Sequence, residues 1–361
     1  MQERPFVSFV QSYVKNSIEK LVEYDFANRC SQLLTDRLAF YILLCNYNRS
    51  SSTTGSESLA KEILQSCLLN FRTDLNRYKP SEQQDIAVML MCIRNRHRYL
   101  DNDIFLILNN AMKLNTIIYS THQTIDVNSA VKSAWYLYYR ISYYRNIDKK
   151  HLWADIYLLC DLLEKMATQD CRSYHTLNSI IKLLSRLNTL SYFSVMLASQ
   201  VEKRIKSLKV LIEEDKYFLN KTRHFDPWLT AESLAIAYLT FKNTDYQRFL
   251  DQVLKKNRQD FDADYVQNCP PSNWQLSYWI YLYKLTPRDQ KGLHLESKRA
   301  DFLRDSIKKN IVYKSTYTTC GPELICNQIY FLLSLVLTMR ENKNEATTSI
   351  VDYLGLHYYV Y

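Results

Sequence analysis

One histidine lies at a place where it could do chemistry. The stretch SYHTLNSIIKLLSRLN, residues 173–188, sets His175 just ahead of an amphipathic helical pattern. An imidazole titrates near neutral pH, so His175 can act as an acid or a base at the mouth of a site. A histidine in the first turn of a helix also bonds its neighbours, and the helix dipole disfavours its charged form there. Both roles are open from this stretch alone.

Carboxylates that could work beside this histidine are dispersed along the chain. Those at the expected starts of apolar helices are Asp85, Asp126, Glu232 and Glu323. A glycosidase needs two carboxylates facing each other across a cleft, and this spacing identifies no such pair. The sequence also has no Gly-rich phosphate loop and no Gly-x-Ser-x-Gly elbow.

The nine cysteines form no CxxC motif and no regular framework. Several lie inside apolar helical runs, where cysteine behaves as a small buried hydrophobe in a reduced compartment. No basic-then-apolar leader opens the chain, and no apolar run reaches about 18 residues. We therefore expect a soluble cytoplasmic protein without membrane insertion.

The elements that must position these residues are expected to be helices. Only 4 Gly and 7 Pro occur in 361 residues, which argues against a nucleotide-binding α/β fold and against a turn-rich β protein. Apolar spacing is helical almost throughout. It predicts helices over residues 5–23, 33–46, 57–76, 81–96, 102–117, 125–143, 150–167, 176–188, 191–214, 228–242, 245–256, 273–284, 296–309 and 322–340.

Two kinds of helical segment alternate along the chain. Nearly all-apolar segments, such as 85–93 and 134–139, alternate with amphipathic charged ones, such as 57–76 and 150–167. A helix that is apolar on every side is buried, whereas one with a charged face is partly wet. The repeat suggests stacked helix pairs, either as a closed α/α toroid or as an open solenoid. Because no consensus of the familiar solenoid families is visible, we expect one closed toroid of about seven helix pairs, a single domain over residues 1–361.

The formal net charge of +9 is compatible with an acidic partner. Basic residues are scattered among acidic ones, and the densest basic run is only residues 94–98. Since no recognition motif accompanies the charge, nucleic-acid binding is not expected. Many of the 29 tyrosines lie inside helical runs and are expected to pack there.

Three stretches carry a family resemblance. Residues 34–71 read LTDRLAFYILLCNYNRSSSTTGSESLAKEILQSCLLNF, and residues 85–115 read DIAVMLMCIRNRHRYLDNDIFLILNNAMKLN. They resemble the first and second helix-pair units of the lanthionine synthetase cyclase family. His175 falls where members of that family carry Ala-His-Gly ahead of an apolar helix, and Ser179-Ile180-Ile181 continues the resemblance.

This resemblance implies an α/α toroid and a zinc-dependent activity. In the family, zinc lowers the pKa of a cysteine thiol of the substrate peptide, and the thiolate adds to a dehydrated Ser or Thr. The resemblance implies that His175 is the acid or base beside that thiolate. A family aspartate corresponds to Asp126. Such a site needs Cys, Cys and His as zinc ligands with a fourth position open.

The implied zinc ligands are mostly replaced in this sequence. The family's Trp-Cys-Tyr-Gly-Asp stretch is similar to residues 228–232, where Trp228 and the acidic Glu232 remain and Leu229 replaces the ligand cysteine. At the adjacent Cys-His pair, Cys269 keeps a ligand position and Pro270 replaces the histidine. No spacing rule supports a substitute ligand set made of His224, Cys269, Cys320 and Cys326. We expect no cofactor, or zinc only if the site is rebuilt.

The glycines that usually open the family's inner helices are replaced as well, for example by Ser272-Asn273-Trp274-Gln275, and larger side chains there should fill the central funnel. We therefore expect a cyclase-like protein of a lanthipeptide-type pathway that binds a precursor peptide or a peptide-modifying enzyme. Its expected contact residues are Trp228, Glu232 and Trp274. An active cyclase-type enzyme and a helical scaffold unrelated to peptide modification remain as alternatives.

Overall fold

The part of the chain that the computed structural model describes comprises residues 3–23, 34–48, 55–73, 77–96, 102–112, 126–145, 148–169, 171–190, 192–218, 227–262 and 332. It contains eleven α-helices and no strand, which confirms the all-α prediction. The helices are α1 (Glu3–Glu23), α3 (Leu34–Asn48), α4 (Gly55–Thr73), α5 (Pro80–Arg96), α6 (Asn102–Met112), α8 (Val127–Tyr144), α9 (Lys149–Thr168), α10 (Tyr174–Leu187), α11 (Ser194–Phe218), α12 (Pro227–Phe241) and α13 (Thr244–Asp262). The predicted helices at 273–284, 296–309 and 322–340 lie outside the described residues, Leu332 excepted.

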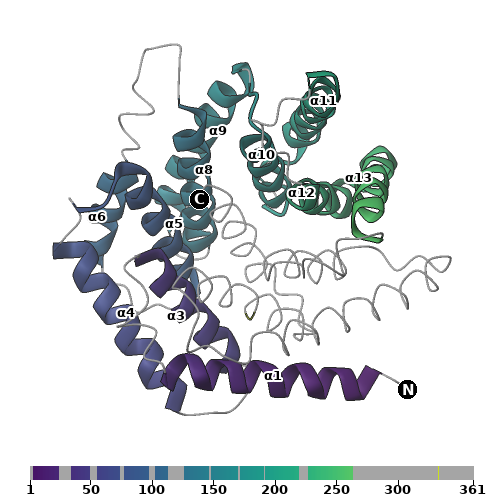
Figure 1. Ribbon diagram of the computed structural model, residues 1–361. Coiled ribbons are helices and arrows are strands. Elements are labelled where there is room, and N and C mark those ends of the chain that lie inside the picture. Colours follow the sequence, from purple (N-terminus) through teal and green to yellow (C-terminus); the bar gives the residue numbers. More distant parts are fainter. Residues whose placement is uncertain are drawn as a thin grey trace. The chain divides into compact units, whose positions relative to one another are not determined.

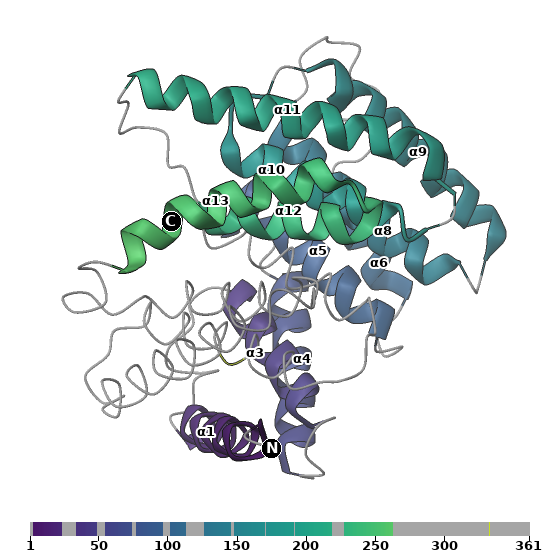
Figure 2. The ribbon, with the colours of Figure 1, turned by 90° about the vertical axis from the view of Figure 1, so that its right-hand side faces the viewer.

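The chain divides into two compact units, drawn in Figures 1 and 2. The first comprises Met1–Leu69 and Gln247–Thr348, and the second comprises Asn70–Tyr246 and Ser349–Tyr361. Each is described by itself below. The single domain and the closed ring expected from the sequence stay predictions.

In the first unit, α3 is the buried helix and α4 the amphipathic one, as the apolar pattern predicts. Leu38, Leu43 and Leu44 of α3 are fully buried, whereas α4 alternates buried and exposed positions. The two helices are joined by Arg37, whose guanidinium Nη2 donates to Ser66 Oγ at 2.7 Å. Burial raises the pKa of the neighbouring Cys67 thiol to about 12, although the charge of Arg37 opposes the shift.

In the second unit, alternate helices form an inner and an outer layer. Helix α8 packs against both α5 and α10, and α10 packs against α12, although other helices separate them in sequence. The intervening helices cover this row: α6 lies on α5, α9 on α8 and α11 on α10 (Figures 1 and 2). Inner and outer helices therefore alternate along the chain, as the apolar and amphipathic segments predict.

The pattern of buried residues along each helix explains whether that helix lies in the inner or the outer layer. In α8, every residue from Ser133 to Tyr139 is buried, and in α10 every residue from Thr176 to Ser185 is buried. Such helices have no face that can be left in water. Helix α9 instead buries one stripe and exposes the opposite face, where Trp153 and Tyr157 lie largely in solvent. It therefore serves as an outer helix.

Neighbouring helix pairs are also joined in the outer layer. Arg204 of α11 donates to the carbonyl oxygens of Met166 and Gln169, and Lys203 donates to the carbonyl oxygen of Ala167 at 3.0 Å. These carbonyls belong to the carboxyl end of α9, where intrahelical donors run out and a positive charge is favourable. One outer helix thus caps the preceding one.

Candidate functional site

The inner helices of the second unit begin side by side at one edge. In the first turns of α10 and α8, Thr176 Oγ1 donates to Asn128 Oδ1 at 2.7 Å. Asn178 Nδ2 of α10 donates to Thr230 Oγ1, in the first turn of α12, at 3.2 Å. The three helices therefore run parallel, and their starts form what we call the amino edge, defined by Asp126, Asn128, His175, Thr176 and Thr230.

Helix α5 begins at the same edge. Lys132 of α8 lies 2.8 Å from Asp85 Oδ2 of α5, and its ammonium also donates to the carbonyl oxygen of Ser81 at 3.1 Å. The lysine is a quarter exposed while the carboxylate is almost buried. This pair fixes α5 against α8 at a place that water still reaches.

A second ion pair lies deeper, between α10 and α12. Lys182 Nζ donates to Glu232 Oε2, and both side chains are fully buried. Beside it, Ser233 Oγ donates to Asn178 Oδ1, while Asn178 Nδ2 also donates to the Tyr174 carbonyl oxygen at 2.9 Å. Buried charges and amides persist only where such partners replace water. This cluster therefore fixes how α10 and α12 align.

The two predicted catalytic residues lie on adjacent helix starts. His175 is half-buried in the first turn of α10, behind Ser173, whose hydroxyl accepts from the Thr176 amide. Asp126 is exposed and caps α8, accepting from the amides of Asn128 and Ser129. Asp126 thus has a structural role as a helix cap, and this role does not depend on any catalytic activity. Acid or base action by either residue stays a prediction.

The predicted contact residues fall in different places. Glu232 is buried and ion-paired, so contact with a peptide would require the Lys182–Glu232 pair to open. Trp228 is the second residue of α12, but its side chain lies outside the described residues. Trp274 lies outside them as well. Peptide contact by these three residues stays a prediction.

Of the zinc-ligand positions that the resemblance implies, only that of Leu229 lies among the described residues. Leu229, at the position of the family's first ligand, is a buried hydrocarbon side chain without a donor atom, so it does not fit a metal. Cys269 and the substitute set of His224, Cys320 and Cys326 lie outside the described residues. Within the described part, no three His, Cys, Asp or Glu side chains are grouped closely enough to hold an ion.

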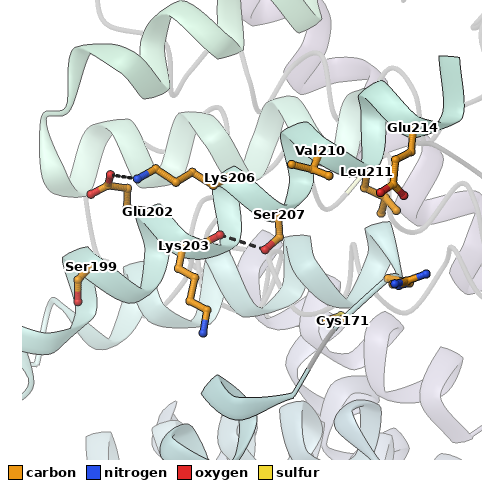
Figure 3. A pocket seen from close by; sticks show the side chains of 10 residues that line it. Cys171, Ser199, Glu202, Lys203, Lys206, Ser207, Val210, Leu211 and Glu214 are labelled. Atoms are coloured by element: carbon orange, nitrogen blue, oxygen red, sulfur yellow. Dashed lines mark hydrogen bonds and ion pairs between the residues drawn. The ribbon is translucent and has the colours of Figure 1, made fainter. Parts of the chain in front are cut away.

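A groove that the sequence did not reveal lies beside the start of α10. It encloses about 600 Å³ between α11 and the segment that leads into the Ser173 cap (Figure 3). We call it the α11 groove. It is lined by Cys171, Arg172, Ser199, Glu202, Lys203, Lys206, Ser207, Val210, Leu211 and Glu214. The lining residues of α11 recur every three or four positions, and this spacing was the sequence feature that could have predicted the groove. By itself, however, the same spacing predicts only the solvated face of an outer helix.

The α11 groove carries both signs of charge. Lys206 Nζ lies 2.7 Å from Glu202 Oε1, and this hydrogen bond and charge hold the pKa of Glu202 below its ordinary value. Close by, burial and the charge of Glu202 raise the pKa of the Tyr246 hydroxyl. Helix α11, which supplies most of the lining, is joined to α10, because the Tyr174 hydroxyl donates to the Leu211 carbonyl oxygen at 2.9 Å.

Comparison of the chain with protein-family models, with curated proteins and with solved structures finds no match. Among the described helices, none combines the length and the apolar character that crossing a membrane requires.

Proposed function

We propose that this chain is a cyclase-like α/α toroid that binds a precursor peptide or a peptide-modifying enzyme of a lanthipeptide-type pathway. The observation that carries the proposal is the amino edge, where parallel inner helices bring His175 and Asp126 onto adjacent helix starts. The alternation of inner and outer helices in the second unit supports the toroid. The resemblance of residues 34–71 and 85–115 to the cyclase family supplies the pathway.

The described residues favour binding over catalysis at this edge. The Asp126 carboxylate accepts three hydrogen bonds from within its own helix start, two from amides and one from Ser129 Oγ at 2.7 Å. Glu232 is buried in an ion pair, and Leu229 offers no metal ligand. A half-buried imidazole next to exposed polar groups can still contact a peptide, so we give His175 a contact role.

The test measures, by fluorescence anisotropy, whether the full chain binds labelled candidate precursor peptides, taken from any short reading frames beside the gene. His175→Ala should weaken binding about tenfold, the loss expected for about 1.4 kcal/mol of contact energy. His151→Ala is the matched control, because His151 is an exposed histidine on outer helix α9. A pull-down with the modifying enzyme completes the test.

Two results would change this assignment. Failure to bind both the precursor and the modifying enzyme would favour a scaffold unrelated to peptide modification. Stoichiometric zinc in the purified protein, lost in Cys269→Ser or His175→Ala, would favour an active cyclase-type enzyme in which other ligands replace the lost ones.

A further inference from the structure

We infer that the α11 groove receives an extended acidic segment of the bound peptide. The inference rests on the proposed function, since it names the chemistry of the segment that would lie next to the amino edge. It does not depend on any catalytic role for His175 or Asp126.

The length of the groove fits a short extended segment. Its lining runs along α11 from Ser199 to Glu214, which is about 22 Å of helix at a rise of about 1.5 Å per residue. An extended chain advances about 3.3 Å per residue, so about seven residues span this distance. Cys171 and Arg172 line the groove from the segment before the Ser173 cap, and Figure 3 shows Cys171 there.

The cationic side chains of the groove can bind further carboxylates. An ammonium group has three N–H donors. Lys203 donates one hydrogen bond to the Ala167 carbonyl oxygen, and Lys206 is paired with Glu202. Both ammonium groups can therefore also donate to a ligand. With Arg172 the groove holds three cations against two carboxylates, within a chain of net charge +9, and this balance attracts an acidic segment.

The groove also exposes an aliphatic side chain of α11 beside its charges. Val210 is 53% exposed on α11, and Leu211 and Cys171 line the groove with it. An aliphatic ligand side chain laid on Val210 would remove apolar surface from water. The occupant that fits is thus an extended segment whose α11-facing positions carry carboxylates at one end and an aliphatic side chain at the other.

A continuous polyanion fits less well than such a peptide. Glu202 and Glu214 lie in the lining, so a nucleic-acid backbone, with a phosphate at every nucleotide, would meet like charges. Spaced carboxylates can avoid both glutamates. The groove also lies close to the amino edge, because Arg172 is followed by the Ser173 cap and then by His175.

The test uses a fluorescein-labelled heptapeptide with Glu at positions 1 and 3, Leu at positions 5 and 7 and Ser between them, so that the four side chains share one face of the extended chain. It is compared with the same peptide carrying Gln in place of Glu, and with single-stranded DNA of seven nucleotides. At low ionic strength, the full chain should bind the Glu peptide about tenfold tighter than the Gln peptide, with the preference falling as salt is added. The double variant Lys203→Gln, Lys206→Gln should lose this preference. The control Lys149→Gln, Lys150→Gln removes two exposed charges from α9 and should keep it.

Equal binding of the Glu and Gln peptides, equal loss in both double variants, or tighter binding of the DNA would overturn the groove assignment. The precursor peptide separates this failure from that of the proposed function. Unchanged precursor binding to the Lys203/Lys206 variant would reject the groove and keep the function. Selective binding of the Glu peptide without any precursor binding would keep the groove and reject the function. Circular dichroism checks that both double variants remain helical.

Discussion

Two lysine–carboxylate pairs join neighbouring inner helices of the second unit, and they differ in how much water reaches them. In the Lys132–Asp85 pair the side chains are 24% and 6% exposed, whereas in the Lys182–Glu232 pair both are 0% exposed. The chemistry is the same in both, a single ammonium on a single carboxylate. What differs is the fate of the partner when one group is removed, because Lys132 can turn towards solvent and Lys182 cannot.

The two pairs therefore differ in the desolvation of their charged groups more than in the attraction between the lysine and the carboxylate. Removing one partner of a buried pair leaves an uncompensated charge, whereas replacing both partners with apolar groups is often neutral or stabilising. Near the surface, solvent takes over much of the role of the lost partner. The buried pair should thus govern the alignment of α10 with α12, while the edge pair makes a smaller contribution.

The largest effect is expected for Glu232→Ala, which leaves Lys182 charged and buried. The free energy of unfolding should fall by about 3–5 kcal/mol, measured by urea denaturation of the full chain. The double variant Lys182→Met, Glu232→Leu should cost far less, because no charge remains inside. If Glu232→Ala cost less than the double variant, burial would not be what distinguishes the two pairs.

Asp85→Ala should have a smaller effect, a loss of about 1–2 kcal/mol in the same measurement. Lys132 keeps its hydrogen bond to the Ser81 carbonyl oxygen and can reach water, so only part of the interaction is lost. A double-mutant cycle with Lys132→Ala gives the coupling directly. A coupling as large as that between Lys182 and Glu232 would remove the contrast between the edge and the interior.

The smallest effect is expected at Asp126, which is an exposed cap. Asp126→Ala should lower the free energy of unfolding by about 1 kcal/mol, because the first turn of α8 loses an acceptor. Asp126→Asn should be close to wild type, since asparagine caps as well as aspartate does. Thermal unfolding of both variants checks this order, and equal losses would show that the charge matters more than the cap.

The helices themselves could be predicted because their signal is local. Apolar periodicity placed the helix at 81–96, and the structure has α5 at Pro80–Arg96. The inner helices were recognisable too, since an all-apolar segment such as 134–139 has no face to leave in water. Helix ends were less accurate: the segment predicted at 125–143 begins as α8 at Val127, with Asp126 as its cap.

The partners across helices could not be predicted, because they depend on how far each helix slides along its neighbour. Glu232 reads in sequence as an acidic group at a helix start, and only the packing of α10 on α12 buries it against Lys182, fifty residues away. The α11 groove likewise depends on where the segment at Cys171 passes α11. Asp126 was predicted inside the helix at 125–143 and as a catalytic residue, whereas the structure has it as the cap of α8, a role that aspartate directly before an apolar helical pattern commonly takes.

The links between helix pairs have a consequence for how this protein melts. The boundary between the α8–α9 pair and the α10–α11 pair is bridged in both layers, for example by Thr176 to Asn128 in the inner layer and by Arg204 to the Met166 carbonyl oxygen in the outer one. In stacked helical repeats, nearest-neighbour coupling decides whether structure is lost cooperatively or one repeat at a time. With side-chain bridges in both layers at this boundary, the second unit should lose these four helices in a single transition.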